Sequence, residues 1–211
     1  FKEEKMRKIQ KMCAVLLAGV MTVGTFAPSV FADEAPAELT DEQVINVRTT
    51  AFGNNYDVQD MGWRWMMAAC YEGLYRDVAD ENGDEFILAG AESVDISDDG
   101  TVYTYHLRED AKWSDGVPVT AHDYEYGWKR LLNPDYAYDY ASFIYNVVGA
   151  EEYNSGEGSA DDVMAVAVDD YTFEVTLKVA DPTFESKLVA TPLYPTREDL
   201  AEAAGDNWGK D

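Results

Sequence analysis

The sequence predicts a mixed α/β fold of the α+β kind, and three observations carry that prediction. Two pairs of strand-like runs each flank a turn with Asn-Gly or Asp-Gly, a strong short-range signal for an antiparallel hairpin. Residues 120–132 have apolar side chains at helical spacing. Strands and helices are mixed without the regular β–α–β alternation of a parallel sheet. The 211 residues allow one or two domains with a sizeable core.

The first 32 residues have the pattern of a secretory signal peptide. Lys5 and Arg7 belong to a basic start, and the stretch from Met12 to Ala32 carries no charge. Small residues, Val30 and Ala32, stand at −3 and −1 of a cleavage point near Ala32. We therefore expect export to the periplasm or the cell surface. A membrane anchor is the alternative, which the polar and helix-breaking residues within the run disfavour.

A lipoprotein signal would place a cysteine directly after a box of small residues. Cys13 instead follows Gln10, Lys11 and Met12 at the start of the apolar run, so no lipobox is evident. Free export is therefore favoured over lipid anchoring.

Cleavage after residue 32 would leave 11 basic and 39 acidic residues, a net charge of −28. Such a field repels nucleic acid and anionic membranes, and surface solvation explains it more simply than an acidic active site. Cys70 would be the single remaining cysteine, so no disulfide can form within residues 33–211. Its apolar, helical surroundings predict a buried, inert thiol.

Residues 33–71 predict an acidic arm, a short strand and a first helix in that order. The arm covers 33–43, the strand 44–48, and a polar loop 51–59. A helix is expected over 60–74, with Gly73 marking its end. Its apolar face is formed by Trp63, Met66, Met67, Cys70 and Tyr71.

Two hairpins are predicted next. Runs at 74–76 and 85–88 flank the acidic turn at 80–84, which contains Asn-Gly. Runs at 93–96 and 102–107 flank Asp98-Asp99-Gly100. Alternation in the last run predicts two faces, one with Tyr103, Tyr105 and Leu107 and the other with Val102, Thr104 and His106.

The clearest helix is expected at 120–132. Thr120 can cap it, and the Asp123 side chain can bond back to the Thr120 backbone N–H to complete a capping box. The inward stripe is Tyr124, Gly127, Trp128, Leu131 and Leu132. Asn133-Pro134 should stop the helix.

The rest of the chain predicts shorter elements. In chain order these are a helix from Ala141 within the tyrosine-rich stretch to 153, a loop at 154–159, strands at 163–168 and 171–179, a short helix from Pro182 to Ala190, an extended segment at 191–196, and a helix at 197–204.

We find no sequence pattern that predicts catalysis, a metal site or a cofactor. The acidic turn fails as a calcium loop, because Val78 and Ala89 would occupy its first and twelfth positions. His106 and His122 have no partner four residues on, and no phosphate-binding or nucleophile motif is present. A carboxylate pair stays open in so acidic a chain. The 14 tyrosines and five tryptophans suit a wet ligand cleft, although core packing is favoured for Trp113, Trp128 and Phe173.

One run resembles a known family. Lys112-Trp113-Ser114-Asp115-Gly116-Val117-Pro118-Val119-Thr120-Ala121-His122-Asp123 resembles the signature of the peptide-binding family of bacterial extracellular solute-binding proteins, the oligopeptide and dipeptide receptors of ABC importers. The likeness extends over about 44–211. Its structural signature is Trp113, Ser114, Asp115, Gly116, Pro118, Thr120 and Asp123, which we expect to build the fold and not to touch the ligand, with Trp113 filling the gap between hairpin and helix.

The resemblance implies a two-lobed clamshell like that of periplasmic binding proteins, closing by a hinge. Residues 33–71 would start lobe one, 72–196 would form an inserted small lobe, and 197–211 would return to lobe one. The opposing lobe would follow Asp211 and be absent here.

The resemblance also implies where the ligand lies. Tyr140 matches a position that faces the peptide, although a packing role for it stays open. Gln59, Asp60, Met61 and Gly62 match a segment that lines the cleft. Tyr56-Asp57-Val58 stands where the family often has a Leu-Asp-Pro step.

The function implied is peptide capture and delivery to the permease subunits of an ABC importer, by a monomer without enzymatic activity. Within the same fold, a nickel complex, haem, an oligosaccharide or a peptide pheromone are alternative ligands. A secreted acidic hydrolase is the alternative from a different class.

Overall fold

The computed structural model describes residues 55–60, 64–80 and 83–210, all within the unit Thr49–Asp211. The predicted signal peptide, the acidic arm and the strand at 44–48 lie outside the described residues. In the part of the chain that is described, no helix has the length and apolar character needed to cross a membrane.

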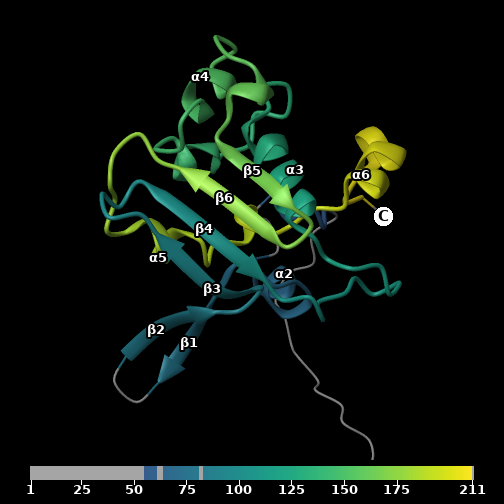
Figure 1. The fold of residues 1–211 in the computed structure, drawn as a ribbon. Helices are drawn as coiled ribbons and strands as arrows, with labels where there is room; N and C mark the ends of the chain where they lie inside the picture. The colour runs from purple at the N-terminus through teal and green to yellow at the C-terminus, as the bar shows by residue number, and fades with distance from the viewer. Residues whose placement is uncertain (1–54, 61–63, 81–82, 211) are drawn as a thin grey trace, which may run out of the picture. The chain divides into compact units, whose positions relative to one another are not determined.

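The largest sheet of the described part of the chain has four antiparallel strands (Figure 1). Its spatial order is β3 (Ala91–Ile96), β4 (Val102–Leu107), β6 (Thr172–Thr176) and β5 (Ala165–Asp169). The predicted pair at 93–96 and 102–107 is confirmed. The predicted pair at 163–168 and 171–179 is confirmed with shorter strands than expected.

The alternation predicted for β4 is also confirmed. Tyr103, Tyr105 and Leu107 are buried, because successive side chains of a strand point to opposite faces. Tyr105 lies opposite Val94 on one neighbouring strand and opposite Phe173 on the other. This face of the sheet therefore carries the core.

The other predicted hairpin forms a separate two-stranded sheet, β1 (Tyr75–Asp80) and β2 (Gly83–Leu88), which projects away from the larger sheet in Figure 1. Its pairing runs from Tyr75 opposite Leu88 to Asp80 opposite Gly83. The Tyr75 and Phe86 rings meet edge to face at 5.6 Å.

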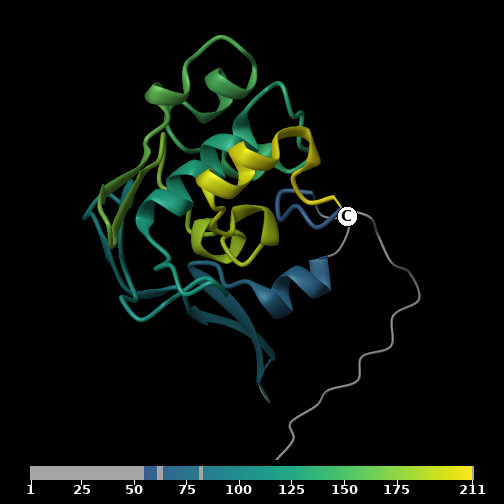
Figure 2. The ribbon, with the colours of Figure 1, turned by 90° about the vertical axis from the view of Figure 1, so that its right-hand side faces the viewer.

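Helix α3 (Ala121–Leu132) covers the core face of the large sheet, and its capping box is confirmed. All five residues of its predicted stripe are buried. Trp128 meets Phe173 edge to face at 5.1 Å and donates its indole N–H to the Leu193 carbonyl at 3.0 Å. Figure 2 shows α3 and α6 (Glu198–Ala204) together on one side of the sheet.

Four of the predicted elements need correction. The described part of the first helix is α2 (Arg64–Cys70), which ends before the expected Leu74. The tyrosine-rich stretch is broken into η2 (Ala141–Ile144) and α4 (Ala150–Asn154), because Gly149 has φ +79° and a Cβ there would lie 2.1 Å from the Asp162 carbonyl.

The third correction concerns the segment expected to be extended. Thr191–Leu193 forms a 3₁₀ turn, η4, with Pro192 in its first turn. The short helix expected from Pro182 begins later, as α5 (Phe184–Lys187). The remaining elements are η3 (Ala160–Asp162) and η5 (Gly205–Asn207).

Candidate ligand-binding surface

The signature run folds into a tight turn that leads into α3. The Trp113 N–H donates to the Val117 carbonyl and the Gly116 N–H donates to the Trp113 carbonyl, both at 2.8 Å. Gly116 has φ +90°, a conformation that glycine adopts without steric cost. Beyond Pro118, the Thr120 N–H donates to Asp123 Oδ2 at 2.8 Å and starts the helix.

Two carboxylates connect this turn to its surroundings. Asp123 also accepts the indole N–H of the half-buried Trp113 at 3.4 Å, and burial raises the pKa of Asp123 against the effect of these bonds. Asp115 accepts from the Val117 N–H and from Arg197 Nη1 at 3.0 Å, which lower the pKa of Asp115. The turn is thus joined to the segment that begins α6.

A buried polar network includes Gln59, one of the residues that the resemblance assigns to the ligand. At its centre, Arg130 Nη2 lies 2.8 Å from Asp57 Oδ2, with side-chain exposures of 6% and 4%. Arg130 also donates to Asp57 Oδ1 at 3.1 Å and to Gln59 Oε1. The Gln59 amide in turn donates to Thr196 Oγ1 at 2.8 Å, which joins three distant segments of the chain.

Two tyrosines cover the Arg130 guanidinium. Its Cζ lies 4.8 Å from the ring centroid of Tyr136 and 5.3 Å from that of Tyr138, within the range of cation–π attraction. Ala137 between them has φ +51°, the one non-glycine residue at positive φ among residues 55–60, 64–80 and 83–210. Such a backbone costs about 1–3 kcal/mol and persists where its surroundings enforce it.

The Tyr138 hydroxyl donates to Asp57 Oδ2 at 2.6 Å. Burial raises the pKa of Tyr138, and the bond and charge of Asp57 raise it further, so the hydroxyl keeps its proton. Burial alone would lower the pKa of Arg130, but the hydrogen bond and charge of Asp57 outweigh it and the pKa is raised. The network is therefore a charged pair with a neutral phenol donor.

Tyr140 lies on the turn that follows. The Ala141 N–H donates to the Tyr138 carbonyl at 3.4 Å and the Phe143 N–H donates to the Tyr140 carbonyl at 3.0 Å. The half-buried Tyr140 ring meets Phe143 edge to face at 5.2 Å. The turn presents Tyr140 partly to solvent, with its backbone fixed at both ends.

The other predicted cleft residues separate into three groups. Gln59 is 1% exposed, and both ends of its amide are bonded inside the network. Asp60 is exposed and accepts from Asn55 Nδ2 at 2.7 Å. Met61 and Gly62 lie outside the described residues.

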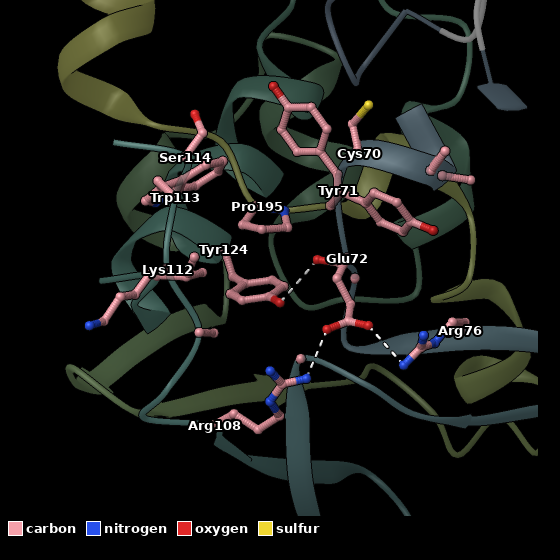
Figure 3. Close-up of a pocket in the computed structure, with 17 residues that line it drawn as sticks. Cys70, Tyr71, Glu72, Arg76, Arg108, Lys112, Trp113, Ser114, Tyr124 and Pro195 are labelled. Atoms are coloured by element: carbon pink, nitrogen blue, oxygen red, sulfur yellow. Dashed lines mark hydrogen bonds and ion pairs between the residues drawn. The ribbon is translucent and has the colours of Figure 1, made fainter. Parts of the chain in front are cut away.

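A groove of about 540 Å³ lies between the end of α2, the signature turn and Pro195 (Figure 3). Glu72 stands between two arginines there, with its carboxylate 2.9 Å from Arg76 Nη2 and 3.0 Å from Arg108 Nη1. Arg108 also pairs with Asp110 at 3.0 Å. Glu72 and Asp110 offset the charges of the two arginines, and Lys112 adds a further positive charge to the lining of the groove.

The prediction of a buried Cys70 is wrong, because Cys70 is exposed and lines this groove. Helix α2 buries Met67 against Val58, and Cys70 lies on the groove side of the helix. Tyr71 beside it meets Trp113 edge to face at 5.9 Å. The residue spacing predicted that Met67 and Cys70 share one buried apolar face. In the structure Met67 is buried and Cys70 is exposed.

The two histidines lie outside these sites. His106 is 3.0 Å from Asp95 and His122 is 3.5 Å from Asp170, and all four side chains are largely exposed. They have the surface placement expected of structural or solvated histidines.

The sequence did not predict the roles of Asp57, Arg130, Tyr138 and Thr196. One signal was present, because Arg130 stands in the sequence between Trp128 and Leu131, two members of the predicted apolar stripe of α3. A charge at a buried position requires a partner, which the sequence alone does not identify.

The chain matches a protein family and several characterised relatives. Residues 85–211 match the model of "Bacterial extracellular solute-binding proteins, family 5 Middle". The periplasmic oligopeptide-binding protein OppA of Salmonella typhimurium is 32% identical over 203 residues, 92% of this chain and 36% of that protein. The oligopeptide-binding protein OppA of Bacillus subtilis is 37% identical over 159 residues, 75% of this chain and 29% of that protein.

Among solved structures, Listeria monocytogenes OppA bound to peptide is similar with a TM-score of 0.72 and 34% identity, over 81% of this chain and 34% of that one. The chain thus spans about a third of the length of these relatives.

Proposed function

The chain belongs to the bacterial extracellular solute-binding proteins of family 5, and from this we propose that the full-length protein captures peptides outside the cytoplasmic membrane for an ABC importer. The observation that carries the proposal is the family match over residues 85–211, which include the signature turn, Arg130 of the network and the Tyr140 turn. The peptide-binding names of the relatives support it.

We place the ligand against the Tyr140 turn. A half-exposed tyrosine on a fixed backbone offers a flat apolar surface with a polar tip, which suits a ligand held by its main chain among hydrated side chains. Asp60 is the other described candidate for contact. Gln59, being enclosed, supports the surface from below.

The domain arrangement is part of the proposal. Residues 33–71 would start lobe one, 72–196 would form the small lobe and 197–211 would return to lobe one. The opposing wall of the cleft would belong to the part of the relatives' length that this chain does not span. Closure of the two walls would then deliver the peptide to the permease.

Export through the predicted signal peptide is also part of the proposal. Residues 1–32 would be removed near Ala32 and the remainder would act as a free monomer, without catalysis or a cofactor. Processing is checked by intact-mass measurement of the secreted protein, which should begin at Asp33.

The experiment that tests the function is a thermal-shift comparison of the full-length protein with four ligand classes. A ligand that binds only the folded state raises the melting temperature by mass action, with about 2.7 kcal/mol of stabilisation at 100 times Kd. We expect a shift with a pool of short peptides. A shift with nickel chelates, haem or oligosaccharides and none with peptides would contradict the proposal.

A further inference from the structure

We propose that the buried Asp57–Arg130 pair positions the ligand-facing turn, acting on Tyr140 through the side chain of Tyr138. The inference rests on the proposed function and extends it to residues that do not touch the ligand. Asp57 and Arg130 are 73 positions apart in the chain and meet at 2.8 Å. Their contact joins the loop at 55–60 to the end of α3.

The first step is the fixing of the guanidinium. Both of its terminal nitrogens bond to Asp57, and one of them also bonds to Gln59. A planar guanidinium held at two points on a carboxylate has one orientation, which a lysine ammonium would not have. Gln59 is anchored on Thr196, so the acceptors themselves are held.

The second step transfers this order to the aromatic segment. Tyr136 and Tyr138 both lie over the Arg130 guanidinium, and their own rings are 5.6 Å apart. The positive φ of Ala137 accompanies their arrangement over the same cation. The hydroxyl of Tyr138 then reaches the carboxylate that holds the arginine.

The third step is the short path from Tyr138 to Tyr140. The Tyr138 carbonyl accepts the Ala141 N–H, which closes a turn with Tyr140 inside it. A displacement of Tyr138 therefore moves the backbone of Tyr140. Tyr140 touches Phe143 on its other side, so one end of the turn depends on the network and the other on packing.

The test uses the full-length protein, three single variants and a Tyr140→Ala background. Tyr138→Phe removes only the hydroxyl that donates to Asp57. Tyr145→Phe is the matched control, because Tyr145 is also half-buried and donates its hydroxyl to one side chain, Asn154 Oδ1 at 2.5 Å. Arg130→Lys keeps the charge and removes the planar fork. Melting temperatures and peptide affinities by titration calorimetry are measured for each, at a temperature where all are folded.

Both Tyr→Phe variants should melt a few degrees lower, because each loses one hydrogen bond. Only Tyr138→Phe should weaken peptide binding, by about tenfold, and Arg130→Lys by at least as much. In a Tyr140→Ala background, Tyr138→Phe should cause no further loss of affinity, because the two residues act in series.

Unchanged affinity in Tyr138→Phe, or equal losses in Tyr138→Phe and Tyr145→Phe, would overturn the inference while leaving peptide capture intact. Fully additive losses with Tyr140→Ala would overturn it as well. A wild-type protein that binds no peptide would instead contradict the proposed function, and the inference with it.

Discussion

At the scale of single residues, buried and exposed ion pairs do different work in this chain. The Arg130–Asp57 pair is almost fully removed from water, and Gln59 and Tyr138 each form a further hydrogen bond to it. A pair of this kind is costly to break because one charge would stay buried alone. Exposed pairs such as Lys178–Glu152 contribute about 0–1 kcal/mol. The network therefore fixes geometry in a way that the surface pairs do not.

Asp181 gives a prediction about pH. It accepts from Lys187 Nζ at 2.6 Å and from the Thr183 hydroxyl and N–H at 2.7 and 2.9 Å, and these groups hold its pKa at about 2. An unfolded aspartate has a pKa of about 3.9. The folded state thus gains stability from this carboxylate above about pH 4, and that gain is lost as the pH falls toward 2.

We expect Asp181→Asn to flatten this part of the acid dependence. The measurement is melting temperature against pH between 5 and 2 for the wild type, Asp181→Asn and the exposed control Asp77→Asn. The wild type should lose more stability than Asp181→Asn over this interval. Parallel curves for those two proteins would show that the Asp181 bonds do not form in solution.

At the scale of elements, the sequence was informative wherever the signal was local. The second hairpin follows from Asp99-Gly100, with Gly100 at φ +70°, and α3 follows from Thr120, Asp123 and the stop at Asn133. These residues determine the backbone conformation of positions only a few residues away, so the sequence alone reveals their effect. The alternation of β4 was predictable for the same reason.

Longer-range features were not predictable in this way. The break at Gly149 depends on the approach of Asp162, and the exposure of Cys70 depends on which segments cover α2. The candidate surface was predictable only in part. Tyr140 and the 59–62 segment came from resemblance, whereas the contact of Asp57 with Arg130 required the folded chain.

The α3 capping box gives a prediction at this scale. Thr120→Ala should lower the stability of the folded state by about 1 kcal/mol, because the side-chain oxygen at an N-cap position satisfies a free N–H of the first turn. Urea unfolding followed by tryptophan fluorescence measures the change. Ser93→Ala, an exposed strand position, is the control and should change stability by less than about 0.5 kcal/mol.

If Thr120→Ala and Ser93→Ala unfold at the same urea concentration, the capping box does not stabilise α3. A loss well above about 2 kcal/mol would instead indicate that Thr120 also supports the signature turn beneath Trp113.

At the scale of the whole molecule, an acidic chain with a net charge of −25 carries a rigid aromatic turn over a buried cation. Segments at 55–60 and 130–140 meet there with Thr196, although they are far apart in sequence. Under the proposed function, this surface would form one wall of the ligand cleft. The proposed function therefore depends on what the full-length protein binds in that cleft.

Native mass spectrometry of the full-length protein, incubated with an equimolar pool of tripeptides to pentapeptides, tests this most directly. We expect complexes whose added masses equal those of intact peptides, and fewer of them in Tyr140→Ala. Release of free amino acids or shortened peptides would identify a hydrolase, and a protein that stays unliganded in the peptide pool would contradict peptide capture.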